Sequence, residues 1–398
     1  MHVRLDASNA TASGDETVTF RADRPVRLLV FRVWAAGPLP AREGTRIHVG
    51  AVREQGRELA ARRPNPTTLV VPLGRTLRAG DAVTVSLPWT LQLPAGAFDR
   101  IAKTGDVFRL GSFFPLLAWD PRRGWVTDRP ATIPGETSTS PVADFDVTVD
   151  APAGDRVLAT GEEESPGRFR ARAVRDFALA AGPFTLATAT AHVPDPVRVT
   201  VGAAGPVVQK PQAYAAAAAR ALTRLSRLYG AYPWPSLSAS VTVDLAGSGI
   251  EYPNMIFLGP GPVSFLTTHE TAHQWFYSLV GNDQAHDPWL DEGLASWAQG
   301  RAGFPYPRRP IPPAARGHMG APMTYWDRHG AAYGAGVYAQ SVAALRSLGA
   351  PAKVDCALRA YVARNAYGIA EPSDLLAALR RFFPRADAVL RRFGVRRP

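Results

Sequence analysis

The 398-residue sequence contains a single cysteine, Cys356, and this scarcity excludes two kinds of stabilising cross-link. One thiol cannot form an internal disulfide and cannot supply a multi-cysteine metal cluster. The chain also lacks any run of about eighteen apolar residues, so we expect no transmembrane helix. Its first residues, MHVRLDASN, do not show the basic-then-apolar order of a signal peptide. The compartment stays open, with export expected only if Met1 is a trimmed start.

Lysine is nearly absent, since only Lys103, Lys210 and Lys353 occur, and the net charge of +11 therefore rests on arginine. The arginine-rich end of the chain could attract an anionic partner through its electric field, and it fits a solvated helix face equally well. No sequence motif that reads nucleic acid accompanies this charge. We therefore expect no nucleic-acid partner.

The sequence as a whole has the composition of a globular protein, with 46% hydrophobic and 9% aromatic residues. The length allows two or three domains. Up to about residue 195, short runs of β-branched and aromatic residues alternate with Pro, Gly and Asp, which predicts an antiparallel β-sandwich or saddle-shaped domain. The expected strands cover residues 16–20, 27–34, 68–73, 82–89, 144–152 and 185–193.

We expect a mixed α/β core over residues 196–325, with residues 326–398 as a helical end of the same domain. The fold class is therefore α+β. In the core we expect a helix over 211–230 that ends at a glycine, a strand over 238–246, a loop over 247–255 and a helix over 264–280. The proline-rich segment 304–315 predicts a loop. Helical patterns return over 337–349, 353–368 and 371–384.

The stretch HETAHQWFYSLVGNDQAHDPWLDE begins with two histidines that flank a glutamate. His269 and His273 are four residues apart, so on a helix both imidazoles lie on one face and can converge on one ion. Asp287 and Pro288 predict the cap and first turn of a second helix, which would bring Glu292 round as a third ligand. Two imidazoles and a carboxylate leave one position for water, as in a catalytic zinc site. The alternative is an amphipathic helix with polar ends.

If one zinc ion is bound, it lowers the pKa of its water to about 7 and polarises a carbonyl group. Glu270, one step round the helix, reaches that water without binding the ion. It would then act as the general base and afterwards as the general acid.

These residues resemble the zinc-binding segment of the M1 family of metallopeptidases, the gluzincin aminopeptidases. His269, Glu270, His273 and Glu292 match the HExxH motif and the glutamate that follows after eighteen intervening residues. The resemblance implies a β-rich N-terminal domain, a thermolysin-like zinc domain and C-terminal helices. It also implies a short form of the family, because the chain ends where longer members continue into a large helical domain.

The loop GSGIEYPNM resembles the exopeptidase loop of the same family, with Ile250 where methionine is usual. The resemblance assigns substrate binding to Gly249, Glu251 and Tyr252. Glu251 would hold the protonated α-amine of a peptide, so the partners would be peptides with a free N-terminus. An exposed loop carboxylate is the alternative. The segment of the β-domain that lines the substrate pocket in many members does not match here, so side-chain preference cannot be carried over.

The family also uses a tyrosine that stabilises the oxyanion, and two tyrosines compete for that role here. Tyr338 has leucines at the expected later positions, whereas Tyr333 has only the glycine, and we choose Tyr338. Either could instead be an ordinary aromatic of a helical core.

The function expected from these features is zinc-dependent aminopeptidase activity. Two alternatives stay open, an endopeptidase or other zinc hydrolase on the same scaffold and a non-catalytic binding protein with a vestigial metal site. The oligomeric state cannot be predicted.

Overall fold

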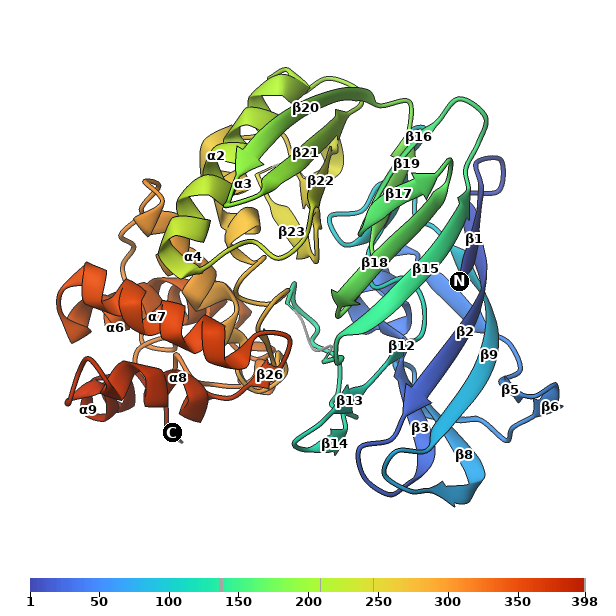
Figure 1. The fold of residues 1–398 in the computed structure, drawn as a ribbon, viewed down its shortest axis with the longest axis horizontal. Coiled ribbons are helices and arrows are strands. Elements are labelled where there is room, and N and C mark those ends of the chain that lie inside the picture. The colour runs from blue at the N-terminus through green and yellow to red at the C-terminus, as the bar shows by residue number, and fades with distance from the viewer. Residues whose placement is uncertain (136–138, 208, 246, 397–398) are drawn as a thin grey trace. The chain divides into compact units, whose positions relative to one another are not determined.

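The chain folds into two compact units in the computed structural model, which describes residues 1–135, 139–207, 209–245 and 247–396 (Figure 1). One unit comprises Met1–Thr132 and Ser138–Phe184, and the other comprises Ile133–Thr137 and Thr185–Pro398. Within the described residues, every helix is too short or too polar to span a bilayer.

The division falls just before strand β20 (Thr185–His192), earlier than residue 195, where the sequence placed it. The reason is that β20 pairs along its whole length with β21 (Pro196–Ala203), which belongs to the second unit. The contacts do not separate residues 326–398 from the rest of that unit.

The first unit consists mainly of β-strands, together with the 3-10 turn η1 (Trp34–Ala36) and the short helix α1 (Pro38–Glu43). Its largest sheet has the order β17-β18-β15-β1-β2-β9-β5-β6, with β4 also paired to β9. Smaller sheets have the orders β10-β11-β19-β16, β12-β3-β8-β7 and β13-β14. The strands are β1 (His2–Asp6), β2 (Thr11–Arg21), β3 (Val26–Arg32), β4 (Arg46–Val49), β5 (Arg53–Glu54), β6 (Arg57–Glu58), β7 (Arg62–Asn65), β8 (Thr68–Leu77), β9 (Ala82–Gln92), β10 (Ile101–Thr104), β11 (Val107–Leu110), β12 (Leu116–Leu117), β13 (Trp119–Asp120), β14 (Gly124–Trp125), β15 (Ala143–Asp150), β16 (Arg156–Ala159), β17 (Glu162–Ser165), β18 (Arg168–Val174) and β19 (Leu179–Gly182).

The strands expected in this unit are confirmed, although the expected one over 27–34 ends at Arg32 and continues into η1. The sheets are not purely antiparallel, because β1 pairs with β15 in parallel. Strands β2 and β9 pair over eleven residues each. A Cβ at Gly14 of β2 would lie 2.3 Å from the ring of Trp89, so only glycine leaves room for that indole.

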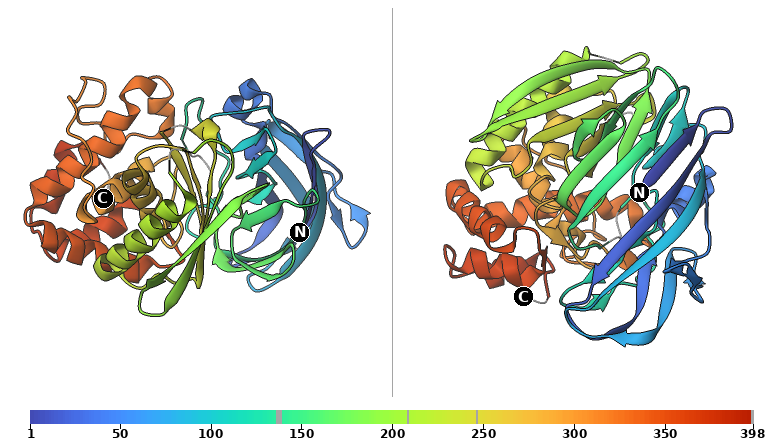
Figure 2. Two further views of the ribbon diagram at one scale, coloured as in Figure 1. Left: turned by 90° about the horizontal axis from the view of Figure 1, so that it is seen from above. Right: turned by 45° about the vertical axis from the view of Figure 1, so that its right-hand side comes forward.

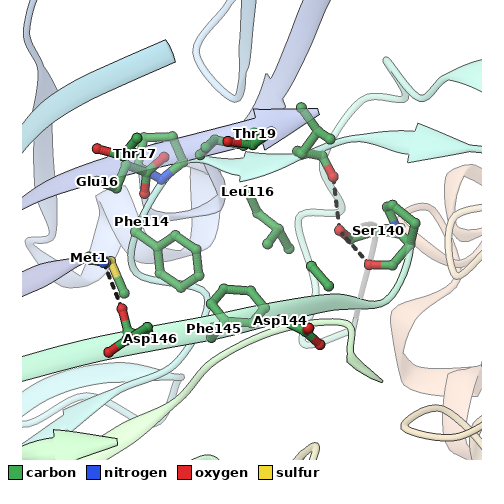
Figure 3. A pocket seen from close by; sticks show the side chains of 15 residues that line it. Met1, Glu16, Thr17, Thr19, Phe114, Leu116, Ser140, Asp144, Phe145 and Asp146 are labelled. Atoms are coloured by element: carbon green, nitrogen blue, oxygen red, sulfur yellow. Dashed lines mark hydrogen bonds between the residues drawn. The ribbon is translucent and has the colours of Figure 1, made fainter. Parts of the chain in front are cut away.

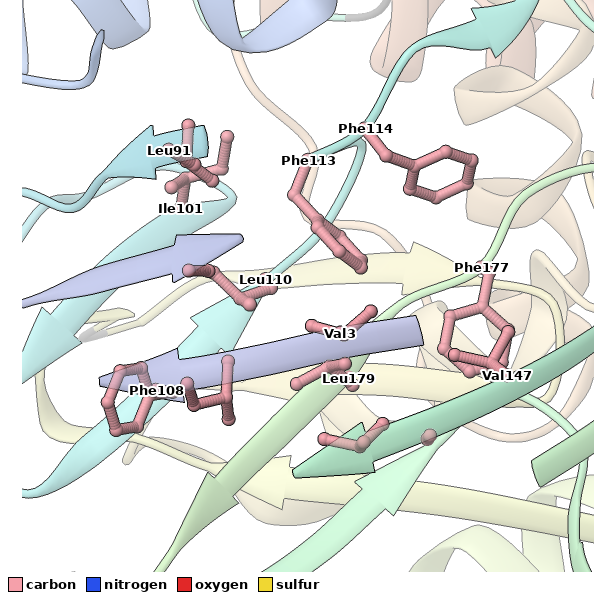
Figure 4. Close-up of a cluster of buried hydrophobic side chains, with 14 of the residues drawn as sticks. Val3, Leu91, Ile101, Phe108, Leu110, Phe113, Phe114, Val147, Phe177 and Leu179 are labelled. Carbon is pink, nitrogen blue, oxygen red and sulfur yellow. The ribbon is translucent and has the colours of Figure 1, made fainter. Parts of the chain in front are cut away.

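Aromatic side chains fill much of the core of this unit, as Figure 4 shows. The ring of Phe113 lies edge-on to both Trp89 and Phe114, with centroids 5.5 and 5.0 Å apart. Edge-to-face packing of this kind adds roughly 0.5–1.5 kcal/mol per pair to the hydrophobic gain. The core is thus fixed by ring geometry as well as by burial.

A cavity of about 290 Å³ lies in the first unit, lined by Phe114, Leu116 and Phe145 together with the carboxyl group of Glu16 (Figure 3). Burial raises the pKa of Glu16 well above its usual value. This carboxyl group therefore favours its neutral form in the fold.

The second unit is built on a mixed sheet with the order β20-β21-β22-β24-β23. Strands β21, β22 and β24 run parallel, and the edge strand β23 is antiparallel to β24. Helix α2 lies along one face of this sheet and contacts α3, as Figures 1 and 2 show. The elements are β22 (Ser236–Val241), β23 (Gly249–Tyr252), β24 (Met255–Leu258), α2 (Pro211–Tyr229), α3 (Val263–Ala272) and the 3-10 turn η2 (Val243–Leu245).

The rest of the second unit is largely helical, and the predicted helices after residue 337 are confirmed in α6, α7 and α8. Residues 304–312 form neither helix nor strand, as the prolines predicted. The elements are β25 (Gly281–Asn282), η3 (Pro288–Leu290), α4 (Glu292–Arg301), α5 (Met323–Trp326), η4 (Gly330–Ala332), the π-helix η5 (Gly334–Ala339), α6 (Gln340–Leu348), α7 (Pro351–Asn365), β26 (Ile369–Ala370), α8 (Pro372–Arg380) and α9 (Ala386–Arg392).

Two expectations for the sheet of the core were wrong. The segment expected to be a loop forms strand β23 and its turn into β24, with Glu251 paired to Ile256 in the ladder. Turn-forming residues on both sides of the four-residue strand hid it in the sequence. The strand expected over 238–246 ends at Val241 and gives way to η2, and residue 246 lies outside the described residues.

Candidate metal centre

Helix α3 carries His269 and Glu270, and His273 caps its C-terminus with helical backbone angles. The helix was expected to run to residue 280, but it ends at Ala272. Beyond it, amide groups bond five residues back, as in Ser278 to His273 at 2.9 Å, and Tyr277 takes a positive φ of 127°. The regular helix therefore ends between the two histidines, with His269 inside it and His273 at its cap.

The second helix, which carries Glu292, also begins at a different residue from the one predicted. The turn η3 is a separate 3-10 turn, and the side chain of Asp287 makes no capping hydrogen bond to it. Glu292 is the first residue of α4 rather than lying one turn inside the helix. A carboxylate at that position sits at the positive end of the helix dipole.

His269, His273 and Glu292 converge on one point from these two helices. Nε2 of His269 lies 3.2 Å from Nε2 of His273 and 3.2 Å from Oε2 of Glu292. Nε2 of His273 lies 3.4 Å from the same oxygen. Zinc bound tetrahedrally at its usual ligand distances requires ligand atoms about 3.3–3.4 Å apart. Three of the four ligand positions of such an ion are therefore in place, and the donor set of two imidazoles and a carboxylate suits zinc.

The hydrogen bonds of Gln299 fix the tautomer of a neutral His269 imidazole. The amide nitrogen of Gln299 donates to the carbonyl oxygen of Phe304 at 2.7 Å, so its Oε1 must be the atom that faces Nδ1 of His269 at 3.0 Å. An amide oxygen only accepts, hence Nδ1 carries the proton and Nε2 of the neutral ring keeps its lone pair. That lone pair is the one a metal needs. Gln299 was not among the residues predicted from the sequence.

Asp291 accepts the corresponding hydrogen bond from Nδ1 of His273. Its Oδ1 lies 2.6 Å from Nδ1 of His273, and its Oδ2 accepts a hydrogen bond of 2.9 Å from Gln284. A buried carboxylate on Nδ1 orients the ring and makes Nε2 a more basic ligand. Asp291 immediately precedes Glu292, so one turn of chain supplies both a ligand and a support for another ligand.

Glu270 is buried, with 3% of its surface exposed, and its carboxyl group packs against the backbone of Gly249. A Cβ at Gly249 would come within 2.6 Å of Oε1 of Glu270. Burial raises the pKa of Glu270 well above its usual value, His273 opposes the shift, and the carboxylates of Glu251 and Glu292 add to it. A divalent cation beside the group would lower that pKa.

Glu251 adds a further carboxyl group to the candidate metal centre, from strand β23. It lies on β23, with 5% of its surface exposed. One oxygen each of Glu251 and Asp291 and one ring nitrogen of His273 all fall within 4.8 Å of one another. The structure thus brings Glu251 next to a metal-facing histidine from a separate element. Tyr252, next along the strand, is fully buried against Phe257, with ring centroids 5.5 Å apart.

Gln274 fastens the strand to the end of the helix. Its amide nitrogen donates to the carbonyl oxygen of Tyr252 at 2.9 Å, and its Oε1 accepts from the amide of Asn254 at 2.8 Å. These two bonds hold the β23–β24 turn against α3, so the carboxylates of Glu251 and Glu270 keep a fixed relation. No sequence pattern predicts this role, because no spacing rule applies to a glutamine that follows HExxH.

Tyr338 is the tyrosine beside the ligands. Its ring lies nearly parallel to His269, with centroids 6.0 Å apart and an angle of 16°. Burial raises the pKa of Tyr338 well above its usual value and Glu292 raises it further, so its hydroxyl stays protonated. Tyr333 lies behind it, packed edge-on against both Trp326 and Tyr338.

No family model matches the sequence, whereas solved structures match its fold. An M1 zinc metallopeptidase from Deinococcus radiodurans has a TM-score of 0.69 at 20% identity, covering 98% of this chain and 92% of that chain. A variant of a two-domain M1 zinc metallopeptidase bound to L-arginine has a TM-score of 0.68 at 20% identity, covering 100% and 93%. A variant from Deinococcus radiodurans bound to the substrate Tyr-Ser-Ala has a TM-score of 0.65 at 19% identity, with the same coverage. The fold of this chain is therefore similar to that of M1 zinc metallopeptidases.

Proposed function

We propose that this chain is a zinc-dependent aminopeptidase that removes the N-terminal residue from peptides. The observation that carries the proposal is the position of Glu251, a buried carboxylate whose oxygen lies within 4.8 Å of a ring nitrogen of the metal-facing His273. A peptide-cleaving centre with a fixed carboxylate at this distance selects substrates that have a free, positively charged α-ammonium group. The fold neighbours support the peptidase class, and one of them holds the tripeptide Tyr-Ser-Ala.

His269, His273 and Glu292 would hold one zinc ion, with Gln299 and Asp291 orienting the two imidazoles. When bound, zinc would lower the pKa of a coordinated water to about 7 and polarise the carbonyl of the scissile bond.

Glu270 performs the proton transfers. Its carboxylate accepts the proton that the attacking water loses and then delivers it to the leaving nitrogen. Gly249 gives this side chain its place, since any larger residue would push the carboxyl group aside. A correctly placed general base of this kind contributes roughly 10²–10⁴-fold to the rate.

Tyr338 acts on the oxygen of the scissile carbonyl. Its protonated hydroxyl would donate a hydrogen bond to that oxygen as negative charge develops there, which is the role of an oxyanion hole. Its ring is held against His269, so the hydroxyl and the metal ligands keep a fixed relation.

Glu251 would receive the α-ammonium group of the first residue through a charge-assisted hydrogen bond. Binding the amine beside the catalytic centre leaves room for one residue before the scissile bond. Gly249 and Tyr252 would contribute to this end of the site through the backbone of β23, because the Tyr252 side chain is fully buried.

The test is hydrolysis of alanine p-nitroanilide and of matched free and N-acetylated tripeptides, before and after chelation of metal. We expect hydrolysis only of the free amines and only with zinc restored. In Glu270→Gln the zinc should remain bound while most turnover is lost. Equal cleavage of free and acetylated peptides would favour an endopeptidase, and bound zinc without turnover of any peptide would favour a non-catalytic binding protein.

A further inference from the structure

A second cavity, of about 360 Å³, lies in the same unit as the metal ligands. Its floor is apolar and is formed by Ile311 of the proline-rich segment and by Val342 of α6. Tyr306 and the side chains of Arg308, Arg309 and Arg346 also line it.

These three arginines are exposed, and within the residues that the structure describes none of them forms an ion pair. Other arginines of the unit are matched with acids, as in Arg301 with Asp355 at 2.6 Å. Three guanidinium groups around one apolar floor give the lining of this cavity a positive charge, because the lining contains no acidic residue. Arginine binds carboxylates well because its planar fork offers two parallel donors.

The cavity adjoins the candidate metal centre through a row of rings. The Tyr306 ring centre lies 6.0 Å from that of Tyr338, which lies 6.0 Å from that of His269. Tyr306 therefore belongs both to the lining of the cavity and to the row of rings that leads to His269.

We propose that this cavity binds the C-terminal carboxylate of short peptide substrates, with Arg309 and Arg346 as the main donors. This inference rests on the proposed function and adds a second anchor to it. Glu251 would hold the positive end of the peptide and the arginines its negative end. The apolar floor suits the last side chain of the peptide.

The reach of the chain sets the length of the peptide. An extended peptide advances about 3.3–3.6 Å per residue. The two ring separations of 6.0 Å therefore place Tyr306 within about three or four residues of His269. Peptides of roughly three to five residues should engage both anchors, and longer peptides should bind without the contribution of the carboxylate.

The experiment measures Kd by calorimetry on the zinc-loaded Glu270→Gln variant, which binds peptides with little turnover. The probes are tetra-alanine as the free acid, tetra-alanine amide, and Ala-Ala-Ala-Asp amide. We expect the free acid to bind roughly three- to tenfold more tightly than the amide at low salt. Adding Arg309→Gln and Arg346→Gln should abolish that difference, whereas Arg364→Gln, an exposed arginine on α7, should leave it intact.

Equal affinity of the acid and the amide would overturn the inference. So would Ala-Ala-Ala-Asp amide binding as tightly as the free acid, because the site would then recognise an acidic side chain instead. Hydrolysis of alanine p-nitroanilide by the wild-type enzyme tests the proposed function separately. That substrate has no C-terminal carboxylate, so the two failures can be told apart.

Discussion

Gln299 accepts a hydrogen bond from Nδ1 of His269 while it donates one to the backbone of Phe304, and the two bonds together leave Nε2 of the imidazole as a ligand. Replacing Gln299 with methionine removes both bonds at similar side-chain volume. We expect zinc affinity to fall about 10- to 100-fold, as is usual when a partner of a metal-binding histidine is lost. Competition with a chromophoric chelator would measure this change, and an unchanged affinity would refute the role.

Gly249→Ala tests the space around the general base. The added Cβ would stand within 2.6 Å of Oε1 of Glu270, so the carboxyl group must move. Zinc content should be unchanged, whereas kcat should fall by about tenfold or more. Gly334→Ala is the control, because a Cβ there meets nothing within 4 Å. Full activity in Gly249→Ala would contradict the placement of Glu270.

Asp355 should be important for the stability of the second unit. Its carboxylate accepts hydrogen bonds from Tyr229 and Trp297, at 3.1 and 3.0 Å, and pairs with Arg301 at 2.6 Å. Asp355→Ala leaves the buried donors of Tyr229 and Trp297 unmatched, and we expect a loss of about 2–4 kcal/mol in the free energy of unfolding. Urea unfolding followed by tryptophan fluorescence would measure it.

The control for Asp355 is Asp387→Ala. Asp387 also forms a close pair with an arginine, Arg380, but on the surface of the unit. Its removal should lower the free energy of unfolding far less than the removal of Asp355, because solvent screens the exposed pair. Equal effects of the two substitutions would show that burial does not matter here.

Asp176 makes stability depend on pH. Burial raises its pKa to about 7, although it accepts hydrogen bonds from Ser112 and from the amide of Phe177. The folded state therefore holds this proton where the unfolded chain, with a pKa near the usual 3.8, has released it. Stability from this group is complete below about pH 4 and is lost as the pH rises to about 7, by up to about 1.4 kcal/mol per pH unit.

Asp176→Asn keeps the shape of the side chain but replaces its carboxyl group with an amide that does not titrate. The difference in urea midpoint between the variant and the wild type should shift in favour of the variant between pH 5 and pH 7.5. Comparing the two proteins at each pH cancels the effects of pH on other groups. A difference that does not vary with pH would contradict the assignment.

The sequence predicted the strands of the first unit and the helices after residue 337 because apolar periodicity alone determines them. It also selected the residues that the structure brings together at the candidate metal centre, because their spacing follows from helix geometry. Other features depend on tertiary contacts and leave no local pattern. Examples are the clamp by Gln274, the support of His269 by Gln299 and the early end of α3.

The choice between two tyrosines shows the same limit. The pattern of later leucines favoured Tyr338, but the sequence offered no distance to any ligand. The position of its ring 6.0 Å from His269 comes from the π-helix η5, whose wider turn no propensity scale predicts. The catalytic role of Tyr338 stays a prediction, and Tyr338→Phe should lower kcat while leaving zinc content unchanged.

Anomalous X-ray diffraction at the zinc edge, from crystals of the purified protein, tests the metal site most directly. We expect one peak per chain, about 2.0–2.2 Å from Nε2 of His269, Nε2 of His273 and Oε2 of Glu292. A zinc-supplemented crystal with no peak among these three atoms, or with its peak elsewhere, would show that these residues do not hold zinc.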